Sequence, residues 1–270
     1  RANALIRDAG GQIVLAGQKD VELAAGSVTA ADGRSGGQIT VDSASGTARV
    51  AGTVHAAGTV GQGGLVEITG ERVALVGNAV VDASGTAGGG TVLVGGDWQG
   101  ANPAVHNAAA TFVAAGASIT ADATSRGDGG KVVVWADGDT RFLGTLSAQG
   151  GANGGNGGQA EVSGKGDLLF LGGARLGAPK GRLGNLLLDP LDLFVDSVGG
   201  LNPYIIDETT DFPDHAVTVS PATLAAITGN VTLYASRDLR FNSAVALTTA
   251  GQGLAASAGR DLQIGAGIST

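Results

Sequence analysis

A pair of small residues followed by alternating apolar positions recurs along the chain at nearly constant spacing. The start-to-start distances are 26, 27, 26, 40, 28 and 26 residues, and 40 is one period plus an insertion. Repeats of this length, with short strands and glycine at the bends, are typical of a parallel β-helix in which each period is one rung. The copies are GGQIVL (10–15), GGQITV (36–41), GGLVEI (63–68), GGTVLV (89–94), GGKVVV (129–134), GGQAEV (157–162) and the degenerate LGNLLL (183–188).

Within each period, a second apolar run follows the first strand and a glycine-rich bend closes the unit, as in RVALVGNAV and then DASGTAGGG. A β-sandwich has turn signals every 8–12 residues without a long fixed repeat, and a helical solenoid needs stretches of 3.6-residue periodicity. Neither pattern occurs here. The sequence therefore predicts an all-β parallel β-helix with rungs of about 26–28 residues.

The repeat also predicts how the chain is divided. Residues 1–189 are expected to form rungs, with an inserted loop near 96–110. Residues 190–229 lack the glycine pairs and are expected to form an irregular connection with a short helix near 221–228. Ser220 would be its N-cap, Pro221 its first residue and Gly229 its C-terminal stop. Residues 230–270 should form further rungs, with Asp238 and Asp261 in equivalent positions.

Composition limits the partners of the chain. A net charge of −8, without a cluster of Lys or Arg, argues against nucleic acid. The absence of cysteine excludes disulfides, and no apolar run is long enough to span a membrane. Residues 1–30 lack the pattern of a signal peptide. Because the chain opens within the repeat, we expect it to be part of a longer protein.

Several stretches together carry a family resemblance: GGTVLVGGDWQG, SRGDGGKVVVWADGDTRFLGTLSAQGG, GNLLLDPLDLFV, VSPATLAA and NVTLYASRDL. The chain resembles the filamentous-haemagglutinin-like exoproteins, the large adhesins of bacterial two-partner secretion. This resemblance implies a right-handed β-helix, a location at the bacterial surface or outside the cell, and export through an outer-membrane transporter. The Asn-Pro-rich motifs of the family's secretion domain are not found, and LNPYIID at 201–207 is not where that domain would lie. We therefore expect the domain that the transporter recognises to lie outside this sequence.

The tripeptide Arg126-Gly127-Asp128 spells a motif that cell-surface receptors read. It occupies the bend before a strand, where other rungs have RSGG or AGGG, and Gly127 and Gly129 would supply positive φ angles there. A bend is the favoured interpretation, and Arg126 and Asp128 remain candidate ligand contacts. In the strand that follows, Lys131, Val133 and Trp135 should face away from Val132 and Val134.

The insertion at 96–110 carries Trp98, Asn102 and His106. We expect it to project from the rod, where a tryptophan can stack on a sugar, so Trp98 and His106 are candidate ligand contacts. For Trp98 itself, the favoured interpretation is that it folds back and covers the rod surface.

Three aspartates, Asp20, Asp139 and Asp167, stand nine residues after the second glycine of their rungs. Paired carboxylates on a β-helix face can perform acid–base chemistry on polysaccharides. Because the position recurs on a distant rung at Asp20, a structural corner is the favoured interpretation.

Other chemistry has little support in the sequence. The stretch GGANGGNGG (150–158) resembles a calcium-binding repeat but has no carboxylate, and the histidines His55, His106 and His215 lack metal-ligand spacing. No catalytic triad or phosphate loop is found. The sequence thus predicts a monomeric adhesive rod without catalytic, cofactor-binding or metal sites, which meets an unknown glycan or protein receptor. The alternative is a carbohydrate-active β-helix enzyme, a polysaccharide lyase or hydrolase.

Overall fold

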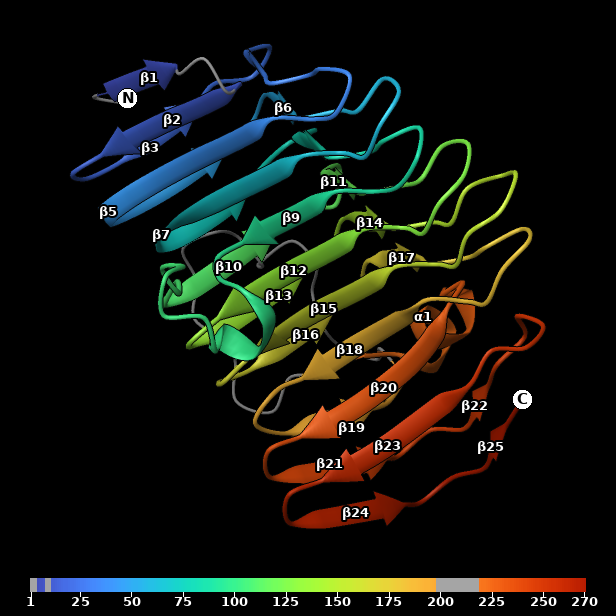
Figure 1. Cartoon of the computed structure of the whole chain (residues 1–270). Coiled ribbons are helices and arrows are strands. Elements are labelled where there is room, and N and C mark those ends of the chain that lie inside the picture. Colours follow the sequence, from blue (N-terminus) through green and yellow to red (C-terminus); the bar gives the residue numbers. More distant parts are fainter. Residues whose placement is uncertain (1–3, 8–10, 198–218) are drawn as a thin grey trace.

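The computed structural model of the chain describes residues 4–7, 11–197 and 219–270. These residues form an all-β parallel solenoid of about nine turns wound around an apolar core. In Figure 1 the turns succeed one another from the blue N-terminal end to the red C-terminal end, so that segments one turn apart lie side by side. The prediction of stacked parallel rungs is confirmed.

One long sheet runs along the solenoid and contains the strand that follows each glycine pair. Register pairs such as Ile39 with Val66 join equivalent positions of consecutive repeats. The strands are parallel except at β1, which pairs antiparallel with β2. In stacking order the strands are β1 (Ala4–Arg7), β2 (Gln12–Gly17), β5 (Gln38–Val50), β7 (Leu65–Leu75), β9 (Thr91–Val94), β12 (Lys131–Ala136), β15 (Gln159–Gly164), β18 (Asn185–Asp189), β20 (Asn230–Ala235) and β23 (Leu254–Ala258).

Each complete turn continues into a second and a third short strand. The second apolar run of the repeat is therefore two strands separated by a bend, where the sequence suggested one. The second strands, besides the later parts of β5 and β7, are β3 (Val21–Leu23), β10 (Ala110–Val113), β13 (Asp139–Phe142), β16 (Leu168–Phe170), β19 (Leu193–Val195), β21 (Asp238–Phe241) and β24 (Asp261–Ile264). The third strands are β4 (Val28–Ala30), β6 (Thr53–His55), β8 (Val80–Asp82), β11 (Ser118–Thr120), β14 (Thr145–Ser147), β17 (Gly173–Arg175), β22 (Val245–Ala246) and β25 (Ile268–Ser269).

The glycine pairs lie where the backbones of successive turns come closest. A Cβ atom on Gly64 would lie 1.9 Å from the carbonyl oxygen of Gly37, and one on Gly90 would lie 2.1 Å from that of Gly64. Leu65 N donates to Gly37 O at 2.9 Å, so this close approach is part of the hydrogen-bonded ladder. The repeat of glycine is thus a steric requirement of stacking.

Equivalent inward side chains stack in ladders that fill the core. Val66, Val92 and Val132 occupy one register position on consecutive strands and are completely buried. Phe142 and Phe170 stack with ring centroids 5.3 Å apart and an interplanar angle of 6°. Burial of one such apolar side chain contributes about 1.5–3 kcal/mol, so the stacked ladders are the main source of stability.

A short helix, α1 (Pro221–Ala226), interrupts the later turns. Ser220 Oγ accepts a hydrogen bond from Thr223 N at 3.0 Å, which confirms the predicted N-cap and the position of Pro221. The helix ends earlier than predicted, because Ile227 is its C-cap and is extended. The prediction that Gly229 stops the helix is wrong: Gly229 packs against Leu176, which would lie 2.8 Å from a Cβ at that position.

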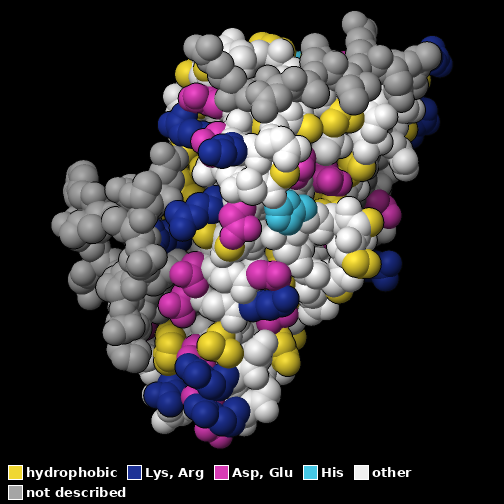
Figure 2. Space-filling model, turned by 90° about the vertical axis from the view of Figure 1, so that its left-hand side faces the viewer, with side chains coloured by type: hydrophobic (Ala, Val, Ile, Leu, Met, Phe, Trp, Pro, Cys, Tyr) yellow, Lys and Arg dark blue, Asp and Glu magenta, His cyan; other side chains and the backbone are white. Residues whose placement is uncertain are grey.

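Arginines of the last turns bind aspartates of the turn before. Arg237 Nε donates to Asp192 Oδ1 at 2.8 Å, and Arg260 Nε donates to Asp238 Oδ1 at 2.8 Å. Figure 2 shows Lys and Arg side chains gathered among Asp and Glu side chains at the lower end of this side of the solenoid. The pairs add polar contacts between turns at the outer corner.

Candidate functional site

The inserted loop 96–110 lies between β9 and β10 and is docked on the outer face of the long sheet (Figure 1). Its Val105 joins Leu93, Val133 and Trp135 in a second buried apolar cluster, outside the core, and Trp98 packs against it. The expectation that the loop projects is wrong, and the interpretation that Trp98 covers the rod surface is confirmed. The cause is the outward row of apolar residues, since large exposed apolar patches on a sheet are unfavourable unless covered.

Trp135 anchors the loop. It is 3% exposed although it points out of the core, which confirms the predicted alternation along β12. Its Nε1 donates to Asp137 Oδ1 at 3.2 Å. Gly100, with a φ of 59°, lies so close that an added Cβ would be 2.6 Å from the indole ring. Only glycine fits at this position, which explains the glycine that ends the GGDWQG segment.

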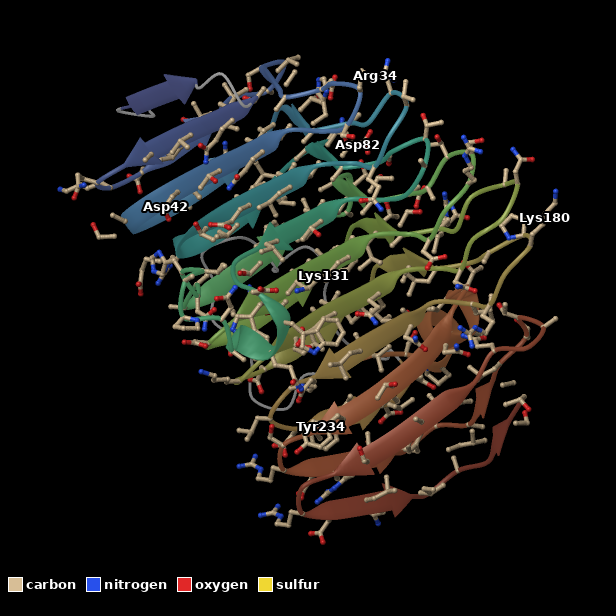
Figure 3. All side chains as sticks on the ribbon, in the orientation of Figure 1. Arg34, Asp42, Asp82, Lys131, Lys180 and Tyr234 are labelled. Carbon is tan, nitrogen blue, oxygen red and sulfur yellow. The ribbon has the colours of Figure 1, made fainter. Side chains whose placement is uncertain are left out.

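An ion pair fixes the first residues of the loop. Asp97 accepts from the ammonium group of Lys131 on β12 and, through Oδ2, from Asn102 Nδ2 at 2.9 Å. Burial raises the pKa of Asp97, but the hydrogen bonds from Lys131, Asn102 and the amide of Trp98 outweigh it and lower the pKa below its ordinary value. Figure 3 labels Lys131 on this face beside the loop. Asn102 is therefore a structural residue of the loop.

Glu161 is a completely buried carboxyl group beneath the loop. It stands on β15 at the outward position between Val133 of β12 and Leu187 of β18. Its Oε2 accepts from the backbone amide of Gln99 at 2.9 Å, and its Oε1 makes no hydrogen bond to any described residue. Burial raises its pKa to about 7, against the opposing effects of the Gln99 amide and of Ser163.

Asp189 is the second carboxyl group that holds Gln99. It ends β18, one rung beyond Glu161, and its Oδ2 accepts from Gln99 Nε2 at 3.3 Å. Asp189 is 8% exposed, and burial raises its pKa. Gln99 has a φ of 53°, an unusual value for a residue with a side chain, so the two carboxyl groups hold the loop in a strained conformation.

The other side of the loop meets a second acidic group of residues. His106 is exposed, and its Nδ1 lies 3.6 Å from Asp42 Oδ1 on β5. Asp42 is hydrogen-bonded to Thr69 at 2.8 Å and is labelled in Figure 3. Burial, and then the charges of Asp42 and Asp97, raise the pKa of Glu67 on β7. His106 is thus positioned by a carboxylate and keeps one exposed side.

The tripeptide 126–128 is a corner of the solenoid. Gly127 has the predicted positive φ, 92°, but Gly129 does not, so that part of the prediction is wrong. Gly129 is required by space, since a Cβ there would lie 2.1 Å from Ala148 O. Arg126 and Asp128 are exposed, and Asp128 Oδ1 accepts from Asn156 N of the next turn at 2.7 Å.

The three recurrent aspartates also lie at corners. Asp20 Oδ1 accepts from Thr47 N at 2.9 Å, and Asp139 Oδ1 accepts from Asp167 N at 2.9 Å. The carboxylates of Asp20 and Asp139 therefore each satisfy a backbone amide of the next turn, as the corner interpretation predicts. The equivalent bond from Asp238 N to Asp192 Oδ1, at 3.2 Å, extends the pattern to the last turns.

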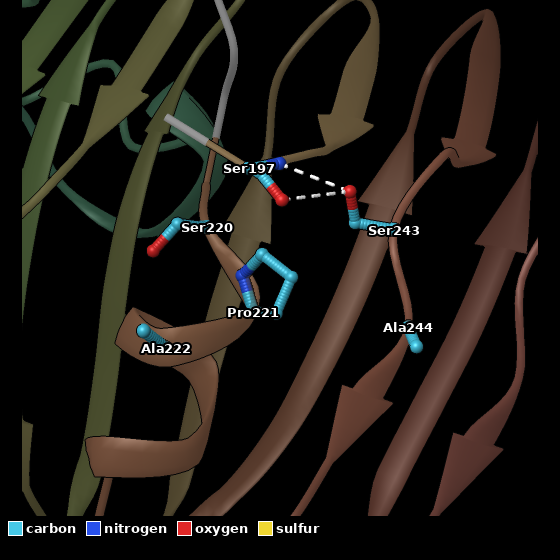
Figure 4. A pocket seen from close by; sticks show the side chains of 6 residues that line it. All are labelled: Ser197, Ser220, Pro221, Ala222, Ser243 and Ala244. Atoms are coloured by element: carbon cyan, nitrogen blue, oxygen red, sulfur yellow. Dashed lines mark hydrogen bonds between the residues drawn. The ribbon is translucent and has the colours of Figure 1, made fainter. Parts of the chain in front are cut away.

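A separate pocket of about 490 Å³ lies beside α1 (Figure 4). Its lining is small and weakly polar, and two of its serines contact each other, with Ser197 N donating to Ser243 Oγ at 3.1 Å. Ser243 Oγ also donates to Asp196 Oδ1 at 2.7 Å. None of the described residues that line it is a histidine that could activate a serine. The lining residues are Ser197, Ser220, Pro221, Ala222, Ser243 and Ala244.

Within residues 4–7, 11–197 and 219–270, no group of three or more His, Asp or Glu side chains is arranged to hold a metal ion. Over the same part of the chain, none of the helices is both long and apolar enough to cross a membrane. His215, noted in the sequence, lies outside the described residues.

Sequence reasoning found Trp98 and His106 but missed the groups that hold the loop: Gln99, Glu161 and Asp189. A signal for Glu161 was present, since in GGQAEV it takes an outward position of the alternation beside apolar Val133. Which outward positions the loop would cover is a matter of tertiary packing, and no local pattern encodes it.

No protein-family model matches the chain, and no curated protein matches it.

Proposed function

We propose that this chain is a structural and adhesive segment of a secreted bacterial surface protein, a stiff rod that holds contact surfaces away from the cell. The observation that carries the proposal is the parallel stack of about nine turns that the described residues form around an apolar core. Such a solenoid is rigid because each turn is joined to the next by backbone hydrogen bonds and by apolar ladders. Its mechanism would be geometric, and we propose no catalytic role.

The resemblance of the sequence to filamentous-haemagglutinin-like exoproteins supports the same proposal. On this basis the chain would reach the cell surface or the medium through an outer-membrane transporter of two-partner secretion. A domain outside this sequence would recognise that transporter. The parallel β-solenoid is the fold that such an adhesin requires.

The contact surface is proposed to include the docked loop. Trp98 is half-buried and His106 is exposed, so the loop presents part of an indole ring and an imidazole on a rigid support. An indole edge and a hydrogen-bonding imidazole suit a glycan or a protein surface. Rigid support lowers the entropic cost of binding, because the loop is already ordered by its bonds to the sheet.

Beads coated with the chain test this proposal by their retention under flow on glycan arrays and on epithelial or bacterial cells. We expect retention on at least one surface, lowered about tenfold or more by Trp98→Ala, since aromatic anchors commonly carry 1.4 kcal/mol or more of binding. Val60→Ser, which removes an exposed apolar side chain elsewhere, is the matched control and should leave retention unchanged. Retention no greater than that of albumin-coated beads on all surfaces would contradict an adhesive role.

One observation favours a second candidate, a carbohydrate-active enzyme. Lys131, Glu161 and Asp189 stand on the outer face of three successive rungs, and Gln99 joins the two carboxyl groups. Paired carboxyl groups can serve as general acid and general base. Glu161 is completely buried, however, so substrate could reach it only if the loop moved. Release of unsaturated or reducing ends from uronate polymers, lost in Glu161→Gln, would establish the enzyme; no release from a panel of such polymers would reject it.

A further inference from the structure

We propose that loop 96–110 is a strap fastened to the long sheet through the buried carboxyl group of Glu161, and that loss of the proton from this group releases the strap. The inference concerns the conformation of the chain itself. It requires neither adhesion nor catalysis, and its test uses no ligand.

The fastening is local and strained. Gln99 is the one non-glycine residue of the described chain with a positive φ, a backbone conformation that is unfavourable for a residue with a side chain. Two acceptors hold Gln99 in this conformation. Glu161 accepts a hydrogen bond from its backbone amide, and Asp189 accepts one from its side-chain amide. If Glu161 no longer held this amide, the strain in Gln99 would favour an open loop.

The surroundings of Glu161 favour the neutral form of its carboxyl group. It is 0% exposed, and its Oε1 lacks a hydrogen-bond partner among the described residues, as does the neighbouring Oγ of Ser163. A buried ionised carboxylate is costly unless its oxygens are paired. A proton on Glu161 would remove the charge, whose burial outweighs the opposing effects of the Gln99 amide and of Ser163.

The direction of the pH effect follows from the two states of the loop. In the closed state the pKa of Glu161 is about 7, and exposure in an open state would return it towards the ordinary value of 4.5. Closure is therefore favoured most below pH 4.5 and is weakened as the pH rises through about 7. The two pKa values differ by 2.5 pH units, so pH can change the equilibrium constant for closing the loop by about 300-fold at most.

Other charged groups surround the strap and must be separated from Glu161. The raised pKa values of Asp189 and Glu67 act in the same direction. Asp97, paired with Lys131, has a lowered pKa and therefore supports closure above the acid range. At the far side of the strap, His106 Nδ1 lies 3.6 Å from Asp42 Oδ1.

Amide hydrogen exchange at Gln99 N tests the proposal, because this amide is the bond to Glu161. Its protection factor, with the intrinsic pH dependence of exchange divided out, should fall about 30-fold or more between pH 5 and pH 8.5. In Glu161→Gln, which keeps an acceptor but does not titrate, we expect high protection at both pH values. His106→Asn removes the imidazole beside Asp42 and should leave the fall in place.

Two comparisons make the outcome decisive. Glu22→Gln changes an exposed carboxylate on β3, away from the strap, and should keep the wild-type profile. The amide of Val134 in β12 should stay protected in every variant, which establishes that the solenoid is folded. A wild-type profile that is flat, or a Glu161→Gln profile that falls with pH or is already low at pH 5, would overturn the proposal.

Discussion

The backbone amide of Gln99 donates a hydrogen bond of 2.9 Å to Glu161 Oε2, across 62 residues of sequence and two turns of the solenoid. Loop 96–110, which is an insertion in the repeat, is therefore bound to the sheet at a defined point. The bond places Trp98 against the outer apolar cluster and leaves His106 at the surface. The geometry of the candidate site depends on this contact.

Gln99→Pro should undock the loop, because proline has no amide hydrogen and cannot adopt a φ near 53°. The loss of the donor leaves Glu161 with no partner for either oxygen, at a cost of about 1–3 kcal/mol. Both tryptophans of the chain, Trp98 and Trp135, lie in this interface, so intrinsic fluorescence should shift to the red and acrylamide quenching should increase. Gln99→Gly, which keeps the amide and tolerates the backbone, should show a much smaller change.

Gly90→Ala should destabilise the solenoid, because the new Cβ would lie 2.1 Å from Gly64 O and the backbones must separate. We expect a loss of about 1–3 kcal/mol or more in the free energy of unfolding, measured by urea denaturation. Gly173→Ala is the matched control, since its Cβ would meet nothing closer than Thr145 at 3.8 Å. Its effect should be within about 0.5 kcal/mol. Equal losses for the two variants would show that the glycine pairs are not sites of close contact.

Asp139→Ala should lower stability by about 1 kcal/mol, because the amide of Asp167 loses its acceptor at 2.9 Å. Asp139→Asn retains an acceptor oxygen and should cost clearly less. Thermal unfolding followed by circular dichroism measures both. If the two variants are as stable as the wild type, the corner role assigned to this aspartate is wrong.

Asp128→Glu should leave attachment of integrin-bearing cells unchanged, because the tripeptide serves as a corner and Asp128 is engaged by Asn156 N at 2.7 Å. Cells plated on surfaces coated with wild type or variant give the comparison, with a linear peptide containing the same tripeptide as competitor. Attachment that is abolished by the variant and by the peptide would establish the tripeptide as a receptor ligand.

Much of the fold could be predicted because the repeat is enforced by local sterics. The glycine pairs mark the corner of each turn, and the apolar alternation that follows assigns the inward faces, as for Val132 and Val134. The N-cap at Ser220 was also a local signal, through its hydroxyl group and the proline that follows. The end of that helix was misjudged because Gly229 is required by packing against Leu176, a contact distant in sequence.

The site was predicted less well, since it depends on contacts between turns. The alternation assigned Val133 and Trp135 to the outer face, but it does not show that the inserted loop covers them. Glu161 and Asp189 hold the loop because Gln99 lies within hydrogen-bond distance of both carboxyl groups in the folded chain. From the sequence alone, a carboxyl group at an outward position of a repeat is expected to be exposed, and only its neighbours in space show that it is buried.

The central claim is that successive repeats stack in parallel and in register, and a disulfide tests it most directly because the native chain has no cysteine. Gln159 and Asn185 are exposed register partners on β15 and β18, and Asn230 is the next partner on β20. Adjacent strands lie about 4.8 Å apart, within the range for a disulfide, whereas positions two strands apart are not. We predict that Gln159→Cys/Asn185→Cys forms an intramolecular disulfide under mild oxidation and that Gln159→Cys/Asn230→Cys does not, as read by mass spectrometry of the folded monomer. A disulfide in the second pair, or none in the first, would contradict the account.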